Sequence, residues 1–333
     1  MFSNLRWVQK RMDRLDPETQ YDEMVRLVAD YRIKPVFMNM TYIVALGGSI
    51  LPPDGAETVW DAGNTVHRGE DRQNGTSDAF FTWFAYGSNS DVTKASVERL
   101  NKYHLGMAKK FPSAFERNED FLYATCSLAL FAVRVREALG LSPETERMKT
   151  AWHHFLRNIS HHLRGLHGHV IDFPQDFSSM RSMCEEFENR DWPRTEIGKQ
   201  VMAAVVQAFC DRWFPKPLHW FGRNLILLVT PENIRKVHRM GNPGPIAGPF
   251  VRAVMGTAIK LQERFAPDPR VPFTVIRTSP EFRRKVARQA ARMQRIHDER
   301  LRRGELPPPP RRETTKQEIL GAGATFTSVG SGA

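Results

Sequence analysis

An all-α fold is predicted for this chain of 333 residues. Apolar residues recur three and four positions apart through most of the chain, and residues typical of helix starts and ends flank these stretches. Apolar and polar residues do not alternate over any long stretch, which argues against a β-sheet fold. Hydrophobic residues make up 41% of the chain, an ordinary fraction for a globular protein. We therefore expect one large helical domain.

The chain divides into four expected parts. Residues 1–30 are expected to form an N-terminal helix or arm, 31–270 the main helical domain, 271–304 a basic C-terminal helix, and 305–333 a proline-rich disordered tail. The tail contains four consecutive prolines at 307–310 and ends in small and polar residues, a composition that cannot bury a core.

The N-terminal part carries a helical apolar stripe, at positions 2, 5, 8, 12 and 15, between basic residues. It lacks the continuous apolar run and cleavage site of a secretory signal. We expect a helix docked on the domain, and the alternative is a helix that lies on a membrane surface. The uncharged stretch Pro35–Pro53 is too short and too rich in glycine and polar residues for a spanning helix, so we expect a buried core helix.

The segment from Asp91 to Phe111 is predicted to be a helix with a histidine on its apolar face. The residues that share this face, three and four positions apart, are Val97, Leu100, His104, Met107 and Phe111. A histidine on such a face needs a partner, because a buried polar group without one is costly. Two interpretations follow for His104: a core histidine satisfied by a hydrogen bond, or a metal ligand.

Cap residues mark the helices that follow. Asn118 is expected to cap a helix that ends at Gly140, and Ser142 followed by Pro143 is expected to start the next. Helices are also expected over 195–213 and 250–265. The apolar run 224–230 fits either a strand or a buried helix turn.

The net charge of +11 is concentrated near the C-terminus. From Glu281 to Arg303 nine Lys or Arg residues stand against three acidic residues, in a segment with helical spacing. Apart from Phe282 near its start, no aromatic residues are interleaved with these charges, so we expect no nucleic-acid partner. We expect a long basic helix that associates with acidic surfaces or lipid headgroups, which would make the protein peripheral to a membrane.

Cysteine and histidine spacing gives no zinc or di-iron pattern. Cys126, Cys184 and Cys210 are widely spaced and include no C-x-x-C pair, which suits a reducing, cytoplasmic location. Six histidines occur between positions 153 and 169, without the Glu-x-x-His pairs of a di-iron bundle. An exposed histidine-rich helix is expected there.

A series of short motifs is more specific in its order than any one of them alone. In sequence they are R-x-x-x-T at 72–76, R-x-N-x-x-H at 99–104, N-E-D-x-L-Y at 118–123, the segment 142–146, and Trp152 with Ile159. Together they resemble the MpaB and latex clearing protein family, which contains the rubber oxygenase catalytic domain. The resemblance spans residues 31–269 and is densest from 72 to 165.

The resemblance implies a globin-like helical core that holds one b-type haem, an iron cofactor, through a single histidine. His104 occupies the position of this axial histidine and is the implied metal ligand. Arg72 and Thr76 match the family's R-x-x-x-T pair and are implied catalytic residues. The resemblance implies a histidine near Thr125 in many relatives, and Thr125 is the third catalytic candidate.

Haem requires an apolar slot and cations for its propionates. The residues expected to contact it, besides His104 and Arg72, are Tyr103, Met107, Phe80 and Phe84. Arg72 is expected to pair with a propionate or to lie over dioxygen. The alternatives are ordinary core aromatic residues, a solvated Arg72, and Thr76 as the N-cap of a helix that begins at Ser77. A Cys126 thiolate is an alternative iron ligand.

The function implied by the resemblance is that of a haem b-dependent oxygenase. Its expected partners are dioxygen and an apolar, isoprenoid or lipid-like small molecule. Two positions differ from latex clearing proteins: Gly75 replaces a lysine able to ligate iron, and Ala108 replaces an arginine. The alternatives are a haem protein without oxygenase turnover, such as a sensor or peroxidase-like catalyst, and a haem-free helical binding protein.

Overall fold

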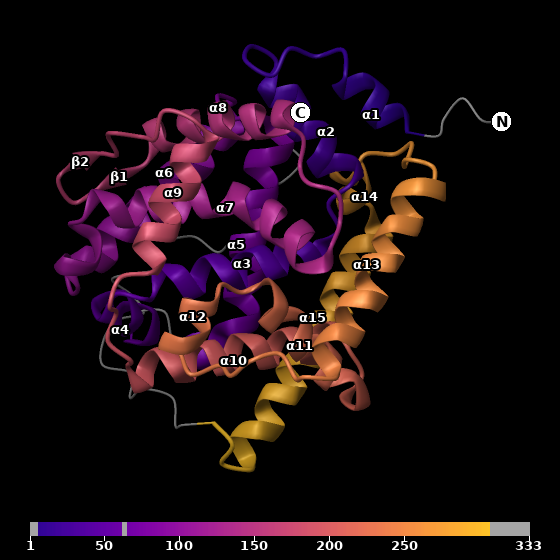
Figure 1. The fold of residues 1–333 in the computed structure, drawn as a ribbon. Coiled ribbons are helices and arrows are strands. Elements are labelled where there is room, and N and C mark those ends of the chain that lie inside the picture. The colour runs from indigo at the N-terminus through magenta and orange to yellow at the C-terminus, as the bar shows by residue number, and fades with distance from the viewer. Residues whose placement is uncertain (1–5, 62–64, 307–333) are drawn as a thin grey trace.

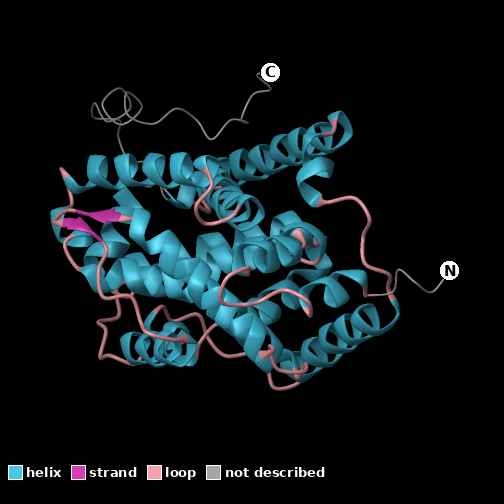
Figure 2. Ribbon diagram, turned by 90° about the horizontal axis from the view of Figure 1, so that it is seen from above, coloured by secondary structure: helices cyan, strands magenta, loops and turns pink. Residues whose placement is uncertain are grey.

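The computed structural model describes residues 6–61 and 65–306, and it confirms the predicted all-α fold (Figure 1). Among these residues the only strands are β1 (Arg164–Gly165) and β2 (Gly168–His169), which form one short antiparallel pair (Figure 2). From residue 307 onward the predicted tail lies outside the described residues.

The helices follow one another along the chain with short connections. The first eight are α1 (Trp7–Met12), α2 (Tyr21–Tyr31), α3 (Pro35–Ser49), α4 (Pro53–Asp61), α5 (Thr65–Tyr86), α6 (Asp91–Ala108), α7 (Asn118–Leu139) and α8 (Glu146–His162). The later ones are α9 (Phe177–Glu188), α10 (Glu196–Trp213), α11 (His219–Val229), α12 (Glu232–Val237), α13 (Ala247–Phe265), α14 (Phe273–Thr278) and α15 (Pro280–Arg302). Two 3-10 turns, η2 (Pro112–Phe115) and η3 (Lys216–Leu218), precede α7 and α11.

The core consists of two apolar clusters that share α3 and α7. One cluster is formed mainly by α2, α5, α6, α8 and α9, and the other mainly by α10, α11 and α13. Both α3 and α7 contribute buried side chains to each cluster, and Figure 1 shows them near the centre of the molecule. The expected burial of α3 is thus confirmed: it is apolar on all sides because it is surrounded.

Gly48 allows α3 and α7 to approach closely. A Cβ atom at this position would lie 1.7 Å from the hydroxyl oxygen of Tyr123, which is fully buried. The hydroxyl of Tyr123 donates to Glu188 on α9, at 2.7 Å. Glu188 also forms a buried ion pair with Arg134, so α3, α7 and α9 meet around one polar group.

Several predicted helix starts are wrong by a few residues. Thr145, not Ser142, caps α8, because its hydroxyl accepts from the Met148 amide. Asn118 is the first residue of α7, and its side chain instead bonds the backbone of Ile171 in both directions. The predicted stop at Gly140 is confirmed, with φ at 64°.

The structure also tests the predictions for four further segments. The helix expected to begin at Ser77 begins at Thr65, with a kink at Arg68, and the run 224–230 forms most of α11 rather than a strand. The expected N-terminal docking is confirmed for residues 8, 12 and 15, whose side chains are buried. The basic segment forms α15, as predicted.

Candidate functional site

The candidate site is centred on His104, near the C-terminal end of α6. The centroid of its ring lies 5.2 Å from that of Phe115 and 6.0 Å from that of Phe121. His104 as a whole is partly exposed, but its Nδ1 atom is buried and has no hydrogen-bond partner among the described residues. A satisfied core histidine would show a partner at this nitrogen, so the interpretation that His104 is merely a hydrogen-bonded core residue loses support.

The imidazole of His104 is neutral over the physiological range. Burial, reinforced by the positive charge of Arg72, lowers the pKa of His104 to about 4. A neutral imidazole retains a nitrogen lone pair, which is the form that binds metal ions. The surroundings of His104 therefore favour ligation over protonation.

Arg72 of α5 faces this end of α6. Its guanidinium group donates a short hydrogen bond to the hydroxyl of Tyr103, and its central carbon lies 5.7 Å from the centre of the Tyr103 ring. The side chain is partly buried, so the alternative of a fully solvated surface arginine is wrong. Arg72, Tyr103 and His104 are therefore neighbours, as the resemblance implies.

Tyr42 of α3 is a member of the site that sequence reasoning missed. It is buried, and burial raises its pKa to about 12, while the charge of Arg72 partly opposes this shift. Its hydroxyl is thus protonated and lies within electrostatic reach of Arg72 and Tyr103. A tyrosine in an otherwise apolar run is a sequence signal for a buried hydroxyl, but α3 has no polar face that would show its direction.

Two glycines leave room beside the contact between Arg72 and Tyr103. A Cβ atom built on Gly69 of α5 or on Gly106 of α6 would meet no atom of another element within 4 Å. Each stands one helical turn from a residue of the contact, and the antiparallel pairing of α5 and α6 brings Gly69 and Gly106 to the same end of the hairpin. Gly69 is buried and Gly106 partly exposed.

The two candidate catalytic threonines occupy different settings. Thr76 lies one turn after Arg72 on α5 and is partly buried; because α5 begins at Thr65, Thr76 is not an N-cap. Thr125 is buried on α7, and its hydroxyl donates to the Phe121 carbonyl at 2.8 Å. Its donor is therefore used within its own helix, and only its oxygen lone pairs can serve a ligand.

The predicted apolar contacts are divided between the site and the core. Met107 is buried one turn after His104. Phe80 is partly buried, with its ring centroid 5.6 Å from that of Trp83. Phe84 packs edge-on against Trp152 of α8, at 5.0 Å, within the cluster between α5 and α8.

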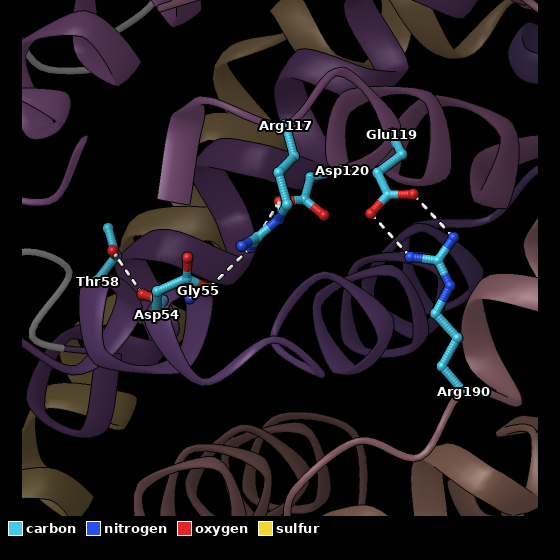
Figure 3. Close-up of polar contacts among 7 residues, drawn as sticks. All are labelled: Asp54, Gly55, Thr58, Arg117, Glu119, Asp120 and Arg190. Carbon is cyan, nitrogen blue, oxygen red and sulfur yellow. Dashed lines mark hydrogen bonds and ion pairs between the residues drawn. The ribbon is translucent and has the colours of Figure 1, made fainter. Parts of the chain in front are cut away.

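The N-E-D motif stands at the start of α7, the helix whose Phe121 packs on His104. Figure 3 shows the ion pairs of Glu119 and Asp120 that anchor this end of the helix. Arg117 bonds both Asp120 and Asp54 at 2.9 Å, which ties α7 to α4. Burial raises the pKa of Asp120 to about 6 although Arg117 opposes this shift. Glu119 forms a two-bond ion pair with Arg190, which follows α9.

Two alternative ligands from the sequence, a residue of the histidine-rich segment and Cys126, have structural surroundings that argue against ligation. His153 is buried and lies 2.8 Å from the Pro174 carbonyl, which differs from the exposed helix expected there. Cys126 is a free thiol whose pKa is raised by burial and by the neighbouring Cys184, so the thiolate that iron ligation requires is disfavoured. Within 6–61 and 65–306 no three His, Cys, Asp or Glu side chains gather as a metal cage.

The residues around His104 fit the haem that the resemblance implies. His104 offers a neutral ring with an unpartnered buried nitrogen, and Phe115 and Phe121 form apolar walls. Arg72 supplies a cation of the kind that pairs with propionates. A single axial histidine needs no cage of protein ligands, so the absence of a three-residue cluster in the described part of the chain does not conflict with this fit.

Comparison with solved structures shows that this all-helical fold is similar to the fold of a latex clearing protein. The solved structure concerned is that of the latex clearing protein LCP in the closed state, with 15% identity and a TM-score of 0.55 over 81% of this chain and 72% of that one. At this identity the similarity shows the fold alone. No protein-family model matches the chain, and neither does any curated protein.

None of the described helices combines the length and the apolar character needed to cross a membrane. For α3, the stretch that most resembled a span in the sequence, this agrees with its place between two core clusters.

Proposed function

We propose that this protein is a haem b-dependent oxygenase-like enzyme that acts with dioxygen on an apolar, isoprenoid or lipid-like small molecule. The observation that carries the proposal is the buried, unpartnered nitrogen of a neutral His104, at the position of the family's axial ligand. The similarity of the fold to that of a latex clearing protein supports the same proposal.

The roles of the side chains follow from their chemistry. His104 would hold the iron through its lone pair without bringing a second positive charge into the site. Arg72 would bind a propionate carboxylate, and Tyr103 holds the guanidinium in place. When bound, the haem supplies an iron centre able to bind and activate dioxygen. Tyr42 and Thr76 offer neutral hydroxyls for orienting a polar ligand.

The visible spectrum of the purified protein tests the proposal. The parent should show a Soret band, and His104→Ala should lose it while its far-ultraviolet circular dichroism stays helical. His161→Ala, which changes an exposed histidine of α8, is the matched control and should keep the band. Full haem content with an unchanged spectrum in His104→Ala would reject His104 as the ligand.

One observation favours the alternative of a haem protein without oxygenase turnover. The resemblance implies a histidine near Thr125 in many relatives, whereas the hydroxyl of Thr125 donates to the Phe121 carbonyl, so it has no proton to offer a reacting group. Dioxygen uptake with polyisoprene or a shorter linear isoprenoid separates the two functions. Uptake that depends on His104 and Arg72 supports the oxygenase, whereas haem binding without uptake supports the alternative.

A further inference from the structure

The outward face of α13 is apolar. Its exposed large side chains, close to whole helical turns apart, are Phe250, Val254, Leu261 and Phe265. We call these four residues the α13 stripe. Trp220 of α11 extends it, with its ring centroid 6.0 Å from that of Phe250. Phe265 is 63% exposed, and several exposed apolar side chains along one helix face are typical of an interaction surface.

The opposite face of α13 is already used. The helix packs against α11 and α7, and Figure 1 shows it along the right-hand edge of the molecule. Val251 is fully buried there, and a Cβ atom on Gly256 would lie 2.5 Å from the carbonyl oxygen of Leu139. This close contact fixes the rotation of the helix, so the stripe is held outward.

Positive charge accompanies the stripe. Arg252, Lys260 and Arg264 are exposed on α13, and none of them has a carboxylate within ion-pair distance in the described part of the chain. Arg252 and Lys260 border a surface hollow of about 270 Å³ between α13 and the end of α7. Arg252 lies on the α7 side of the helix, close to Gly140, so the cations beside the stripe are Lys260 and Arg264. Arg264 lies 5.6 Å from the ring centre of Phe265.

The nearby negative charges are neutralised within the protein. Glu263 of α13 pairs with Arg136 of α7 at 2.7 Å. Asp268, just after α13, lies 3.6 Å from Arg32 and accepts the Val8 amide. The stripe therefore presents apolar side chains together with cations that have no carboxylate partner among the described residues.

We propose that α13 is a peripheral membrane-binding helix, which lies on a bilayer surface that contains anionic phospholipids. Aromatic and aliphatic side chains on one face, with Lys and Arg beside them, are the pattern of a helix in the plane of the lipid headgroups. A second copy of the chain is the competing occupant. A parallel symmetric pair along the stripe would bring Lys260 and Arg264 close to their own counterparts, so like charges oppose that arrangement.

The other two elements expected at a membrane fit less well. In the described part of the N-terminal stripe, residues 8, 12 and 15 are buried in the core, so these side chains cannot contact a membrane. On α15 the large apolar residues are Phe282, Met293, Ile296 and Leu301, all at least partly buried, and Val286, which is 39% exposed. α15 thus offers charge without an apolar stripe, whereas α13 offers both.

Vesicle sedimentation tests the assignment. The full chain should sediment with vesicles of phosphatidylcholine mixed with phosphatidylserine, more weakly with phosphatidylcholine alone, and less as salt increases. Lys260→Glu with Arg264→Glu should weaken binding at least about tenfold, because each basic residue near an anionic surface contributes about fivefold. Arg288→Glu with Arg292→Glu on α15 carries the same charge change and should lose less.

A second pair of variants isolates the apolar contribution. Leu261→Ser with Phe265→Ser should lose most binding to anionic vesicles, whereas Leu166→Ser with Ile171→Ser, which changes exposed apolar residues elsewhere, should keep it. Circular dichroism confirms that both proteins are folded. Three outcomes would overturn the proposal: no sedimentation of the parent at low salt, equal loss in both serine variants, or a parent dimer in solution that Leu261→Ser with Phe265→Ser dissociates.

Discussion

At the scale of single residues, the charge state of His104 makes a prediction about pH. The pKa of His104 is about 4 in the folded protein and about 6.5 in the unfolded chain. Between these values only the unfolded chain takes up the proton, so stability that is fully present above pH 6.5 is lost as the pH falls toward 4. For a shift of this size the loss at pH 5 is about 2 kcal/mol.

The free energy of unfolding of the haem-free protein, measured with urea at pH 7 and pH 5, checks this prediction. His104→Phe keeps an aromatic ring beside Phe115 and Phe121 but cannot titrate, so its loss over the same interval should be smaller by about 2 kcal/mol. Other histidines with lowered pKa values, such as His238, are present in both proteins and cancel in the difference. Equal losses in the two proteins would mean that His104 titrates normally.

Glu188 gives a second residue-scale prediction. It is buried, pairs with Arg134 and accepts from Tyr123, so Glu188→Ala leaves a buried guanidinium group without its counter-charge. The expected cost is about 3–5 kcal/mol of unfolding free energy. Glu119→Ala removes the half-exposed pair with Arg190 and should cost at most about 1 kcal/mol. Urea unfolding of both variants compares them, and similar costs would contradict the importance of the buried group.

At the scale of helices, two glycines within helices should respond in opposite ways to alanine. Gly48→Ala places a methyl group on the Tyr123 hydroxyl, where neither α3 nor α7 can yield easily, and should cost more than about 2 kcal/mol. Gly106→Ala meets no neighbour within 4 Å in α6 and should stabilise the protein by about 0.5–1 kcal/mol. Thermal unfolding measures both, and a destabilised Gly106→Ala would show that the space beside it is occupied.

Helical periodicity predicted the helices well because most of them have one buried face. It located α6, α10 and α15 closely, and cap chemistry located the end of α7. Prediction of a helix start from a cap residue was wrong where the side chain has a tertiary partner, as for Asn118, which bonds the backbone of Ile171 instead. The secondary structure of the run 224–230 stayed ambiguous because an apolar stretch that is buried on several sides shows no alternation of apolar and polar residues.

Site residues could be predicted from the sequence only where they lie on helices with a clear apolar spacing or a family motif. The resemblance brought Arg72, Tyr103 and His104 to attention, and the structure places them together. Tyr42 and Phe115 come from an apolar helix and a short turn, where neither spacing nor motif indicates direction. The packing of α3, η2 and α7 decides which aromatic residues face His104. This packing is tertiary structure, which sequence spacing does not reveal.

At the scale of the whole molecule, α15 is expected to be separable from the site. It packs against α5, α10 and α14, with Met293 as its buried apolar residue and Arg300 paired to Asp211 at 2.6 Å. His104 contacts Phe115 and Phe121, and all three lie on other elements. A chain that ends at residue 279 should therefore fold and keep the proposed haem binding.

The truncated chain should nevertheless be less stable. Loss of the burial of Met293 costs about 2 kcal/mol, and Asp211 loses its arginine but regains contact with water, which limits the cost of that change. Thermal unfolding followed by circular dichroism, together with haem content from the visible spectrum, tests both parts. A lower midpoint with an unchanged haem-to-protein ratio is the expected result. Complete loss of haem in a chain that remains helical would show instead that α15 holds α5, and with it Arg72, in the position that the site requires.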